Sequence, residues 1–166
     1  MPGRSGAILL VALAASVAAI DQLTKALLAS AMSSGRLAYR VEIIGDWFAL
    51  EYTENRGAAF GLFSGIAPIL TGVSIAIATG LLWHYLRQAR PSLLQTLATG
   101  AITGGAIGNL IDRIRRGYVI DFLSVGPWPN FNVADSAITV GALVLVWGLT
   151  RPASGVTSEQ PIDQGG

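Results

Sequence analysis

Apolar residues fall into four long blocks along the chain, and most of the charged residues lie in the polar segments between them. The blocks cover approximately residues 7–31, 65–86, 93–111 and 133–149. A helix needs roughly 20 mostly apolar residues to cross a bilayer, because the hydrocarbon core is about 30 Å thick and each residue advances the helix by about 1.5 Å. The pattern therefore predicts an all-α integral membrane protein with four transmembrane helices.

The segments between the blocks predict how these helices are connected. Residues 87–91 form a very short link, so we expect the second and third helices to make an antiparallel hairpin. A longer segment joins the first two helices and contains residues 41–52, which are rich in β-branched and aromatic side chains. Gly45 and Asp46 interrupt that stretch, which predicts two short strands around a turn on the membrane surface. Residues 57–63 predict a short interfacial helix.

Residues 1–152 thus form a single four-helix membrane domain that includes the surface segment 32–64. The polar tail, residues 153–166, is expected to be disordered because it lacks apolar periodicity. The first block also has the charged start and apolar run of a cleaved secretory signal. Its apolar character nevertheless continues past Asp21, and Asp21 and Lys25 share one face of a continuing helix. We therefore interpret the first block as a retained transmembrane helix.

Composition narrows the class of protein further. Charged residues make up 13% of the chain against roughly 25% in an average soluble domain, and the mean hydropathy of +0.55 argues against a soluble enzyme or a disordered chain. A net charge of +1 is too small for a surface that binds nucleic-acid phosphates. The absence of cysteine and the single histidine exclude a disulfide framework, a thiolate nucleophile and a cysteine or multi-histidine metal site.

Polar side chains within the apolar blocks mark candidate functional positions, because lipid makes each of them costly. Asp21 and Lys25 lie one turn apart on the first helix. They can form a self-neutralising ion pair that fixes helix packing, or they can belong to a functional site. Asn109 and Arg113 have the same spacing at the end of the third helix. The arginine can extend towards the membrane surface, but the asparagine beside it indicates a polar pocket.

Two acids remain in strongly apolar surroundings, Asp121 after the third helix and Asp135 in the first turn of the fourth, only 14 positions later. Both therefore lie at the same membrane face. Two partly desolvated carboxyl groups tend to share one proton, and aspartic proteases use such a pair to activate water and to protonate the scissile peptide. Alternatively, Asp135 forms a capping box with Asn132, and Asp121 is a surface acid paired with Arg115 or Arg116.

Five segments, found in the same order and at compatible spacings, give the chain a close resemblance to the lipoprotein signal peptidases, the type II signal peptidases of bacteria. They comprise residues 21–25, 54–61, 104–113, 117–122 and 131–137. The resemblance implies a multi-pass enzyme of the bacterial cytoplasmic (inner) membrane, with both termini in the cytoplasm and the active site on the outer face. It also implies that the strands of residues 41–52 form a small extracytoplasmic β-cradle between the first two helices.

The resemblance further implies a function, that of an aspartic endopeptidase that removes signal peptides from prolipoproteins. Cleavage is expected before a diacylglyceryl-modified cysteine, without a metal or another cofactor. The implied partners are the lipid-modified prolipoprotein and the lipid bilayer, with no nucleic acid. By position, Asp121 and Asp135 are the catalytic pair. The polar residues expected to line or support the site are Asn55, Gly57, Asn109, Arg113, Asn132, Asp21 and Lys25.

The main alternative is a non-enzymatic membrane protein, such as a small transporter or a proton-relay subunit. A relay needs polar groups distributed through the depth of the membrane, whereas here the polar residues between Asn109 and Asp135 gather at one end of the helices. That clustering favours a catalytic face. A structural membrane anchor is a third possibility, and it requires that Asp→Asn changes at positions 121 and 135 leave function intact. Arginines lie on both sides of the membrane in this arrangement, so charge counting alone does not orient the chain.

Overall fold

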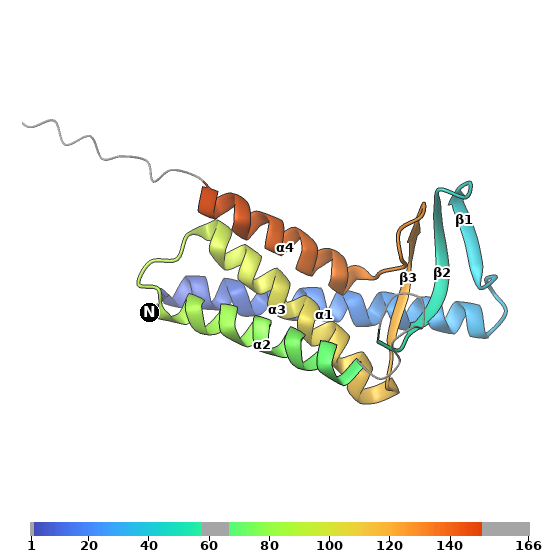
Figure 1. The fold of residues 1–166 in the computed structure, drawn as a ribbon, viewed down its shortest axis with the longest axis horizontal. Coiled ribbons are helices and arrows are strands. Elements are labelled where there is room, and N and C mark those ends of the chain that lie inside the picture. Colours follow the sequence, from blue (N-terminus) through green and yellow to red (C-terminus); the bar gives the residue numbers. More distant parts are fainter. Residues whose placement is uncertain (1, 58–66, 151–166) are drawn as a thin grey trace, which may run out of the picture.

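Four helices lie alongside one another with a three-stranded sheet across one end in the computed structural model, which describes residues 2–57 and 67–150 (Figure 1). The elements are α1 (Arg4–Ser33), β1 (Arg40–Ile44), β2 (Phe48–Asn55), α2 (Ala67–Arg87), α3 (Leu93–Arg116), β3 (Val119–Val125) and α4 (Val133–Thr150). Each predicted apolar block is therefore a helix. Most of the predicted interfacial helix after Gly57 and the predicted disordered tail lie outside the described residues.

The helices differ in how well they meet the length and hydropathy that membrane crossing requires. Among the described residues, α1 alone meets both, and Val133–Gly148 of α4 form a shorter apolar helix. The α3 helix is less apolar because it is the central helix, in contact with α1, α2 and α4, and it places polar side chains such as Thr99 and Asn109 inside the bundle. The hydropathy of α3 averaged over all its residues is therefore lower than the hydropathy of its outward-facing residues alone.

Glycines on α3 allow the neighbouring helices to approach closely. A Cβ atom at Gly104 would lie 2.5 Å from the carbonyl oxygen of Ala14 on α1, and one at Gly105 would lie 2.5 Å from the carbonyl oxygen of Ala134 on α4. These separations are far shorter than van der Waals contact, so the two helices can pack here only against glycine. The close packing brings the middle of α1 and the start of α4 together beside α3, where Asp21 Oδ1 lies 2.9 Å from the backbone nitrogen of Ala134.

The sheet has the strand order β1-β2-β3, with both neighbouring pairs antiparallel. The predicted hairpin of residues 41–52 is confirmed, because β1 and β2 flank the turn around Gly45 and Asp46. The third strand corrects the sequence prediction, which placed the cradle between the first two helices alone and predicted no strand at Asp121. It enters from the connection between α3 and α4 because its apolar side chains are buried against the rest of the protein, and it pairs with β2 along most of its length.

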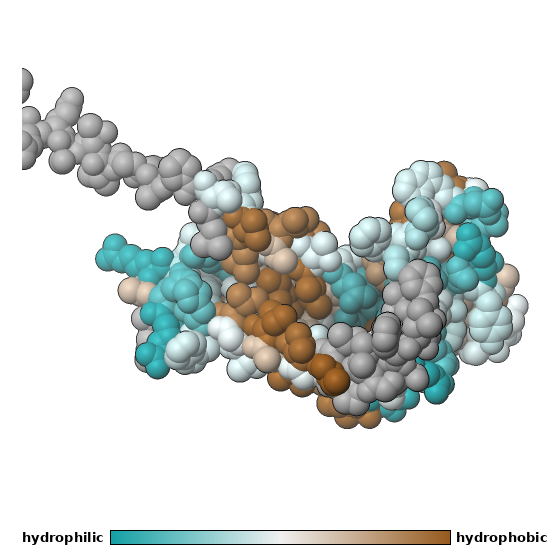
Figure 2. Space-filling model, in the orientation of Figure 1, coloured by the Kyte–Doolittle hydropathy of each residue, from teal (hydrophilic) through white to brown (hydrophobic). Residues whose placement is uncertain are grey.

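Large apolar side chains on the outside of the bundle remain exposed to the surroundings. They include Ile8, Val11, Leu23 and Leu27 of α1, Ile69 and Ile77 of α2, and Val140, Leu143 and Val146 of α4. Figure 2 shows the resulting apolar surface over the helices, with hydrophilic residues gathered at the two ends of the molecule. An apolar surface of this extent requires a partner or a lipid environment.

Candidate active site

The two candidate acids come from different elements that meet where the helices end at the sheet. Asp121 lies on β3 opposite Thr53 of β2, and it is 2% exposed. Asp135 lies in the first turn of α4 and is half-buried. Figure 2 shows hydrophilic surface in the recess between α4 and the sheet, where these two elements approach each other. The fold therefore brings together the pair that sequence analysis selected.

Asn132 links the two acids directly. Its Nδ2 donates a hydrogen bond of 2.7 Å to Asp121 Oδ1, while its Oδ1 accepts a 2.9 Å hydrogen bond from the backbone N–H of Asp135. The second of these bonds is the helix cap that sequence analysis considered as an alternative role for this segment. Capping and site-building are thus combined in one fully buried side chain.

Asn109 holds the other acid from the central helix. Its Nδ2 donates to Asp135 Oδ1 at 2.7 Å, and its Oδ1 accepts hydrogen bonds of 3.1 Å from both Lys25 Nζ and Asn132 Nδ2. Because an ammonium group can only donate, Lys25 fixes which side of the Asn109 amide faces Asp135. The amide is therefore locked in the orientation that presents a donor to the carboxyl group.

Asn55 and Gly57 complete the surroundings of Asp121 from the end of β2. Asn55 Nδ2 donates to Asp121 Oδ2 at 2.9 Å, and Asn55 Oδ1 accepts a 3.0 Å hydrogen bond from the backbone N–H of Gly57. Gly57 is buried and has a φ of 136°, a backbone conformation that side chains of L-residues rarely adopt. The glycine thus allows the chain to turn back over Asn55.

Arg113 is the one predicted site residue that the described structure leaves apart from this hydrogen-bond network. It lies in the last turn of α3 and is half-buried. Its guanidinium group forms no hydrogen bond or ion pair with any residue in the described ranges. A charged group in that position remains available to a bound molecule.

Lys25 is the centre of a larger charge network than the sequence indicated. Its Nζ lies 2.8 Å from Asp21 Oδ2 and 2.8 Å from Asp112 Oδ2, and all three side chains are fully buried. The Asp21–Lys25 pair was predicted, but Asp112 was not singled out. Its position one turn after Asn109 on the same helix face is the signal that could have identified it.

The environment of Asp121 favours a protonated carboxyl group. Burial raises its pKa to about 6 from an ordinary value of 3.8, while the hydrogen bond from Asn55 acts in the opposite direction. The negative charge of Asp135 raises the pKa of Asp121 in the same direction as burial does. One protonated and one ionised carboxyl group is the arrangement that acid–base hydrolysis of a peptide bond requires.

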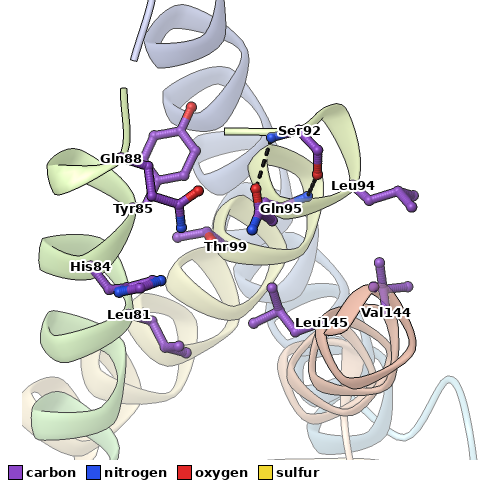
Figure 3. Close-up of a pocket in the computed structure, with 11 residues that line it drawn as sticks. Leu81, His84, Tyr85, Gln88, Ser92, Leu94, Gln95, Thr99, Val144 and Leu145 are labelled. Carbon is purple, nitrogen blue, oxygen red and sulfur yellow. Dashed lines mark hydrogen bonds between the residues drawn. The ribbon is translucent and has the colours of Figure 1, made fainter. Parts of the chain in front are cut away.

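A second cavity lies at the opposite end of the helices, beside the link between α2 and α3 (Figure 3). It has a volume of about 310 Å³ and is lined by side chains of α2, α3 and α4, including Tyr85, Gln95 and Thr99. Ser92 and Gln95 form a capping box at its edge, which starts α3. None of the candidate site residues lines this cavity, so it is separate from the acidic pair.

The site can now be compared with known proteins. The family model for signal peptidase (SPase) II matches residues 13–151, which include every candidate site residue. The chain belongs to the signal peptidase II family. It is therefore a peptidase, and the interpretation as a non-enzymatic transporter, relay subunit or anchor is wrong.

Curated relatives cover most of this signal peptidase II chain. The lipoprotein signal peptidase of Moorella thermoacetica is 43% identical over 143 residues, which span 85% of this chain and 92% of that protein. The lipoprotein signal peptidase of Mycobacterium avium is 40% identical over 144 residues, or 83% of this chain and 76% of that protein. The resemblance stated from the sequence is thus confirmed.

Solved structures share the fold of the chain. A bacterial membrane enzyme determined by the in meso method at 1.9 Å resolution matches with a TM-score of 0.75 and 29% identity, covering 87% of this chain and 94% of that one. A second such structure, at 2.3 Å resolution, matches with a TM-score of 0.75 and 27% identity, covering 91% and 93%. The helices and the small antiparallel sheet are therefore those of a bacterial membrane enzyme.

Proposed function

We propose that this signal peptidase II removes signal peptides from prolipoproteins as an aspartic endopeptidase, with Asp121 and Asp135 as its catalytic pair. The printed names of its relatives support the prolipoprotein substrate. The observation that carries the catalytic assignment is the Asn132 bridge, which ties the carboxyl group of Asp121 to the first turn of α4 at Asp135. The two other buried acids in the described residues, Asp21 and Asp112, both form ion pairs with Lys25, whereas neither Asp121 nor Asp135 forms an ion pair with a described residue.

The hydrogen bonds around the two acids suit a mechanism in which they share one proton. The ionised carboxylate takes a proton from a water molecule, and the water oxygen attacks the carbonyl carbon of the scissile peptide bond. The protonated carboxyl group donates its proton to the carbonyl oxygen. When the resulting tetrahedral intermediate collapses, the C–N bond breaks and the departing amine takes up the proton that came from the water. A hydroxyl group of the intermediate returns its proton to the other carboxylate as the C=O bond re-forms, which leaves one proton on the pair again.

The amide donors keep both carboxyl groups oriented for these steps. Asp121 receives one hydrogen bond on each oxygen, from Asn132 and Asn55. Asp135 receives one on Oδ1 from Asn109, and its Oδ2 has no hydrogen-bond partner among the described residues. Among the described residues, Asp135 Oδ2 is therefore the carboxyl oxygen of the pair that is left to contact water.

We assign the remaining predicted residues to the substrate side of the site. The guanidinium group of Arg113, which has no side-chain partner among the described residues, can bind carbonyl oxygens of the peptide. Gly57 has no side chain that could obstruct a bound peptide beside Asn55. The amides of Asn55, Asn109 and Asn132 hold the two carboxyl groups. Asp21 and Lys25 support the site from the interior of the helix bundle.

The membrane arrangement that fits this chemistry has all four helices crossing the bilayer, with the sheet and the acids at the outer face. In Figure 1 the N-terminus, the link between α2 and α3 and the end of α4 lie together at the other end, which we place in the cytoplasm. A site at the helix ends lets the diacylglyceryl group of the substrate remain in lipid while its peptide bond reaches water. Cleavage before the lipid-modified cysteine is what the resemblance to the family implies, and a site at this depth is compatible with it.

The decisive experiment measures cleavage of a diacylglyceryl-modified prolipoprotein in liposomes by the wild type, Asp121→Asn and Asp135→Asn. Each substitution keeps the side-chain volume and removes one carboxyl group, so we expect a loss of about 10³-fold or more. Asp46→Asn, an exposed acid in the turn of the β1–β2 hairpin, is the matched control and is expected to retain full activity.

Thermal unfolding of each variant separates lost chemistry from lost folding. Near-normal cleavage by a folded Asp121→Asn or Asp135→Asn variant contradicts the catalytic pair. The same prolipoprotein without its diacylglyceryl group tests the substrate class, and equal cleavage of both forms contradicts a requirement for the lipid.

A further inference from the structure

The buried network around Lys25 is bonded to the backbone immediately before each candidate catalytic acid. Asp21 Oδ1 accepts a 2.9 Å hydrogen bond from the backbone N–H of Ala134, the residue before Asp135. Asp112 Oδ2 accepts a 3.3 Å hydrogen bond from the backbone N–H of Ile120, the residue before Asp121. The two elements that carry the acids are thus each held by one carboxylate of the same network.

The two carboxylates are joined to each other through one ammonium group. Lys25 Nζ lies 2.8 Å from Asp21 on its own helix and 2.8 Å from Asp112 on α3. Its third contact is the 3.1 Å hydrogen bond to Asn109 Oδ1, and Asn109 in turn donates to Asp135. One cation therefore connects α1 and α3 and, through the hydrogen bonds of its partners, reaches β3 and α4.

We propose that Lys25, Asp21 and Asp112 form a clamp that sets the separation of the two catalytic carboxyl groups. The three residues are positioning residues, since they act through Ile120, Ala134 and Asn109. The proposal rests on the proposed function, because it takes Asp121 and Asp135 as the acids that share a proton. It adds Asp112 to the functional residues and gives the Asp21–Lys25 pair a defined mechanical role.

Burial is what makes such a clamp rigid. The side chains of Asp21, Lys25 and Asp112 are fully buried, and the residues that they hold, Ile120 and Ala134, are at most 1% exposed. Water cannot compete for these hydrogen bonds, and a displaced carboxylate would leave an unpaired charge inside the protein. The side chains of Asp21, Lys25 and Asp112 are therefore held in a single arrangement.

A role in stability alone does not account for this arrangement. Buried ion pairs contribute little net stability compared with well-packed apolar side chains, because desolvation offsets most of the attraction between the charges. The carboxylates moreover use one oxygen each to hold the chain directly next to an acid of the site. Sharing of a proton depends steeply on the separation of the two carboxyl groups, and that separation is what these bonds fix.

Asp112 offers a clean test, because its Oδ2 accepts from both Lys25 and the Ile120 N–H. Its Oδ1 accepts from Gln22 and pairs with Arg116. Asp112→Asn removes the charge and the Oδ1 acceptor but keeps an oxygen that can accept both bonds made by Oδ2. Asp112→Ala removes the charge and the acceptor together. Both variants lose the charge and the Oδ1 contacts with Gln22 and Arg116, so the difference between them reports the loss of the Oδ2 acceptor for Lys25 and the Ile120 N–H.

The experiment measures kcat, KM and the pH profile of prolipoprotein cleavage for the wild type and both variants. We expect kcat to fall about 100-fold in Asp112→Ala and about 10-fold in Asp112→Asn, with KM within about twofold of the wild type, because misplacement by about 1 Å can cost that much in rate. Glu51→Gln removes an ion pair with Arg40 within the β1–β2 hairpin, away from the clamp, and is expected to leave all three unchanged.

The pH profile separates positioning from charge. Loss of the negative charge acts on both catalytic carboxyl groups in the same direction, so both limbs of the profile move together in Asp112→Asn and Asp112→Ala. Loss of the clamp lets Asp121 and Asp135 move apart, which weakens the repulsion between their carboxylates and brings the two limbs of the pH profile closer together. We expect this narrowing of the profile above all in Asp112→Ala.

The clamp is overturned if folded Asp112→Asn and Asp112→Ala have equal kcat values and pH profiles of equal width. That result leaves Asp112 with a role in charge or stability. Should Asp112→Ala not fold, Asp112→Ser replaces it, because its shorter side chain does not reach the same position. Full activity of Asp121→Asn overturns the proposed function itself. If Asp121→Asn and Asp135→Asn are inactive while both Asp112 variants keep wild-type kinetics, the clamp is rejected and the proposed function stands.

Discussion

Asp121 lies in a buried environment in which its only hydrogen bonds to described side chains come from two neutral amides, those of Asn55 and Asn132. Such donors stabilise a carboxylate less than a cation in contact would, and burial therefore determines the direction in which the pKa moves. A site that must hold a proton near neutral pH needs this balance. The same balance makes the stability of the protein depend on pH.

The sign of that dependence can be predicted. A carboxyl group whose pKa is raised in the folded state stabilises the fold below its unfolded pKa, and that contribution is lost as the pH rises towards about 6. Between pH 4 and pH 7, we expect the unfolding free energy of the wild type to fall relative to that of Asp121→Asn by on the order of 2–3 kcal/mol, since each pKa unit corresponds to about 1.4 kcal/mol.

Thermal unfolding of the two proteins in detergent across this pH range measures the difference. The constant cost of exchanging a carboxyl group for an amide cancels, because only the change with pH is compared. A difference in Tm that stays the same at every pH would show that the carboxyl group of Asp121 is not desolvated.

At the scale of single residues, sequence analysis found the acids and amides but not all of their partners. Asp121, Asp135, Asn109 and Asn132 were selected because polar groups in apolar surroundings are costly and because they match a family pattern. Asp112 was missed because spacing along one helix shows which residues share a face but not what the facing helix presents. Asp112 pairs with Arg116 one turn along its own helix, but its buried partner is Lys25, on a helix far away in the sequence.

Helices and strands differed in how well the sequence specified them. The four helices follow from local apolar blocks, and the β1–β2 hairpin follows from β-branched residues around one turn. The third strand, β3, depends on pairing with β2, which lies more than 60 residues earlier in the chain. Asp121 also interrupts its apolar pattern, so no local signal distinguished it from a loop.

The packing of α3 against α4 gives a prediction at this scale. A Cβ atom at Gly105 would lie 2.5 Å from Ala134 O and 2.8 Å from Ile138 on α4, so Gly105→Ala must push the two helices apart. We expect a loss of about 1–3 kcal/mol in stability, together with reduced cleavage, because the shift moves Asp135. Differential scanning calorimetry and the cleavage assay measure the two effects.

Gly80→Ala on α2 is the matched control for this substitution. No heavy atom lies within 4 Å of a Cβ built at Gly80, so alanine there should leave the stability unchanged or raise it by up to about 1 kcal/mol through better helix propensity. Equal effects of the two substitutions would show that the α3–α4 contact is looser than the structure indicates.

The whole molecule combines an apolar band over the helices with hydrophilic groups at both ends (Figure 2). This distribution supports a transmembrane orientation but not its direction, and the arginines on both sides explain why charge counting did not supply it either. The direction follows instead from the proposed chemistry. A substrate that is processed after export must meet the acids on the outer side.

The chain contains no cysteine, so single introduced cysteines can report which end faces out. Asp46→Cys places a thiol in the exposed turn of the β1–β2 hairpin, and Ala89→Cys places one in the exposed link between α2 and α3. In spheroplasts, a membrane-impermeant maleimide should label Asp46→Cys directly and Ala89→Cys only after permeabilisation, because the bilayer separates the two ends of the helices. Cleavage by both variants confirms that they are folded. The reverse labelling pattern would place the acids in the cytoplasm, where an exported substrate could not reach them, and would contradict the proposed orientation.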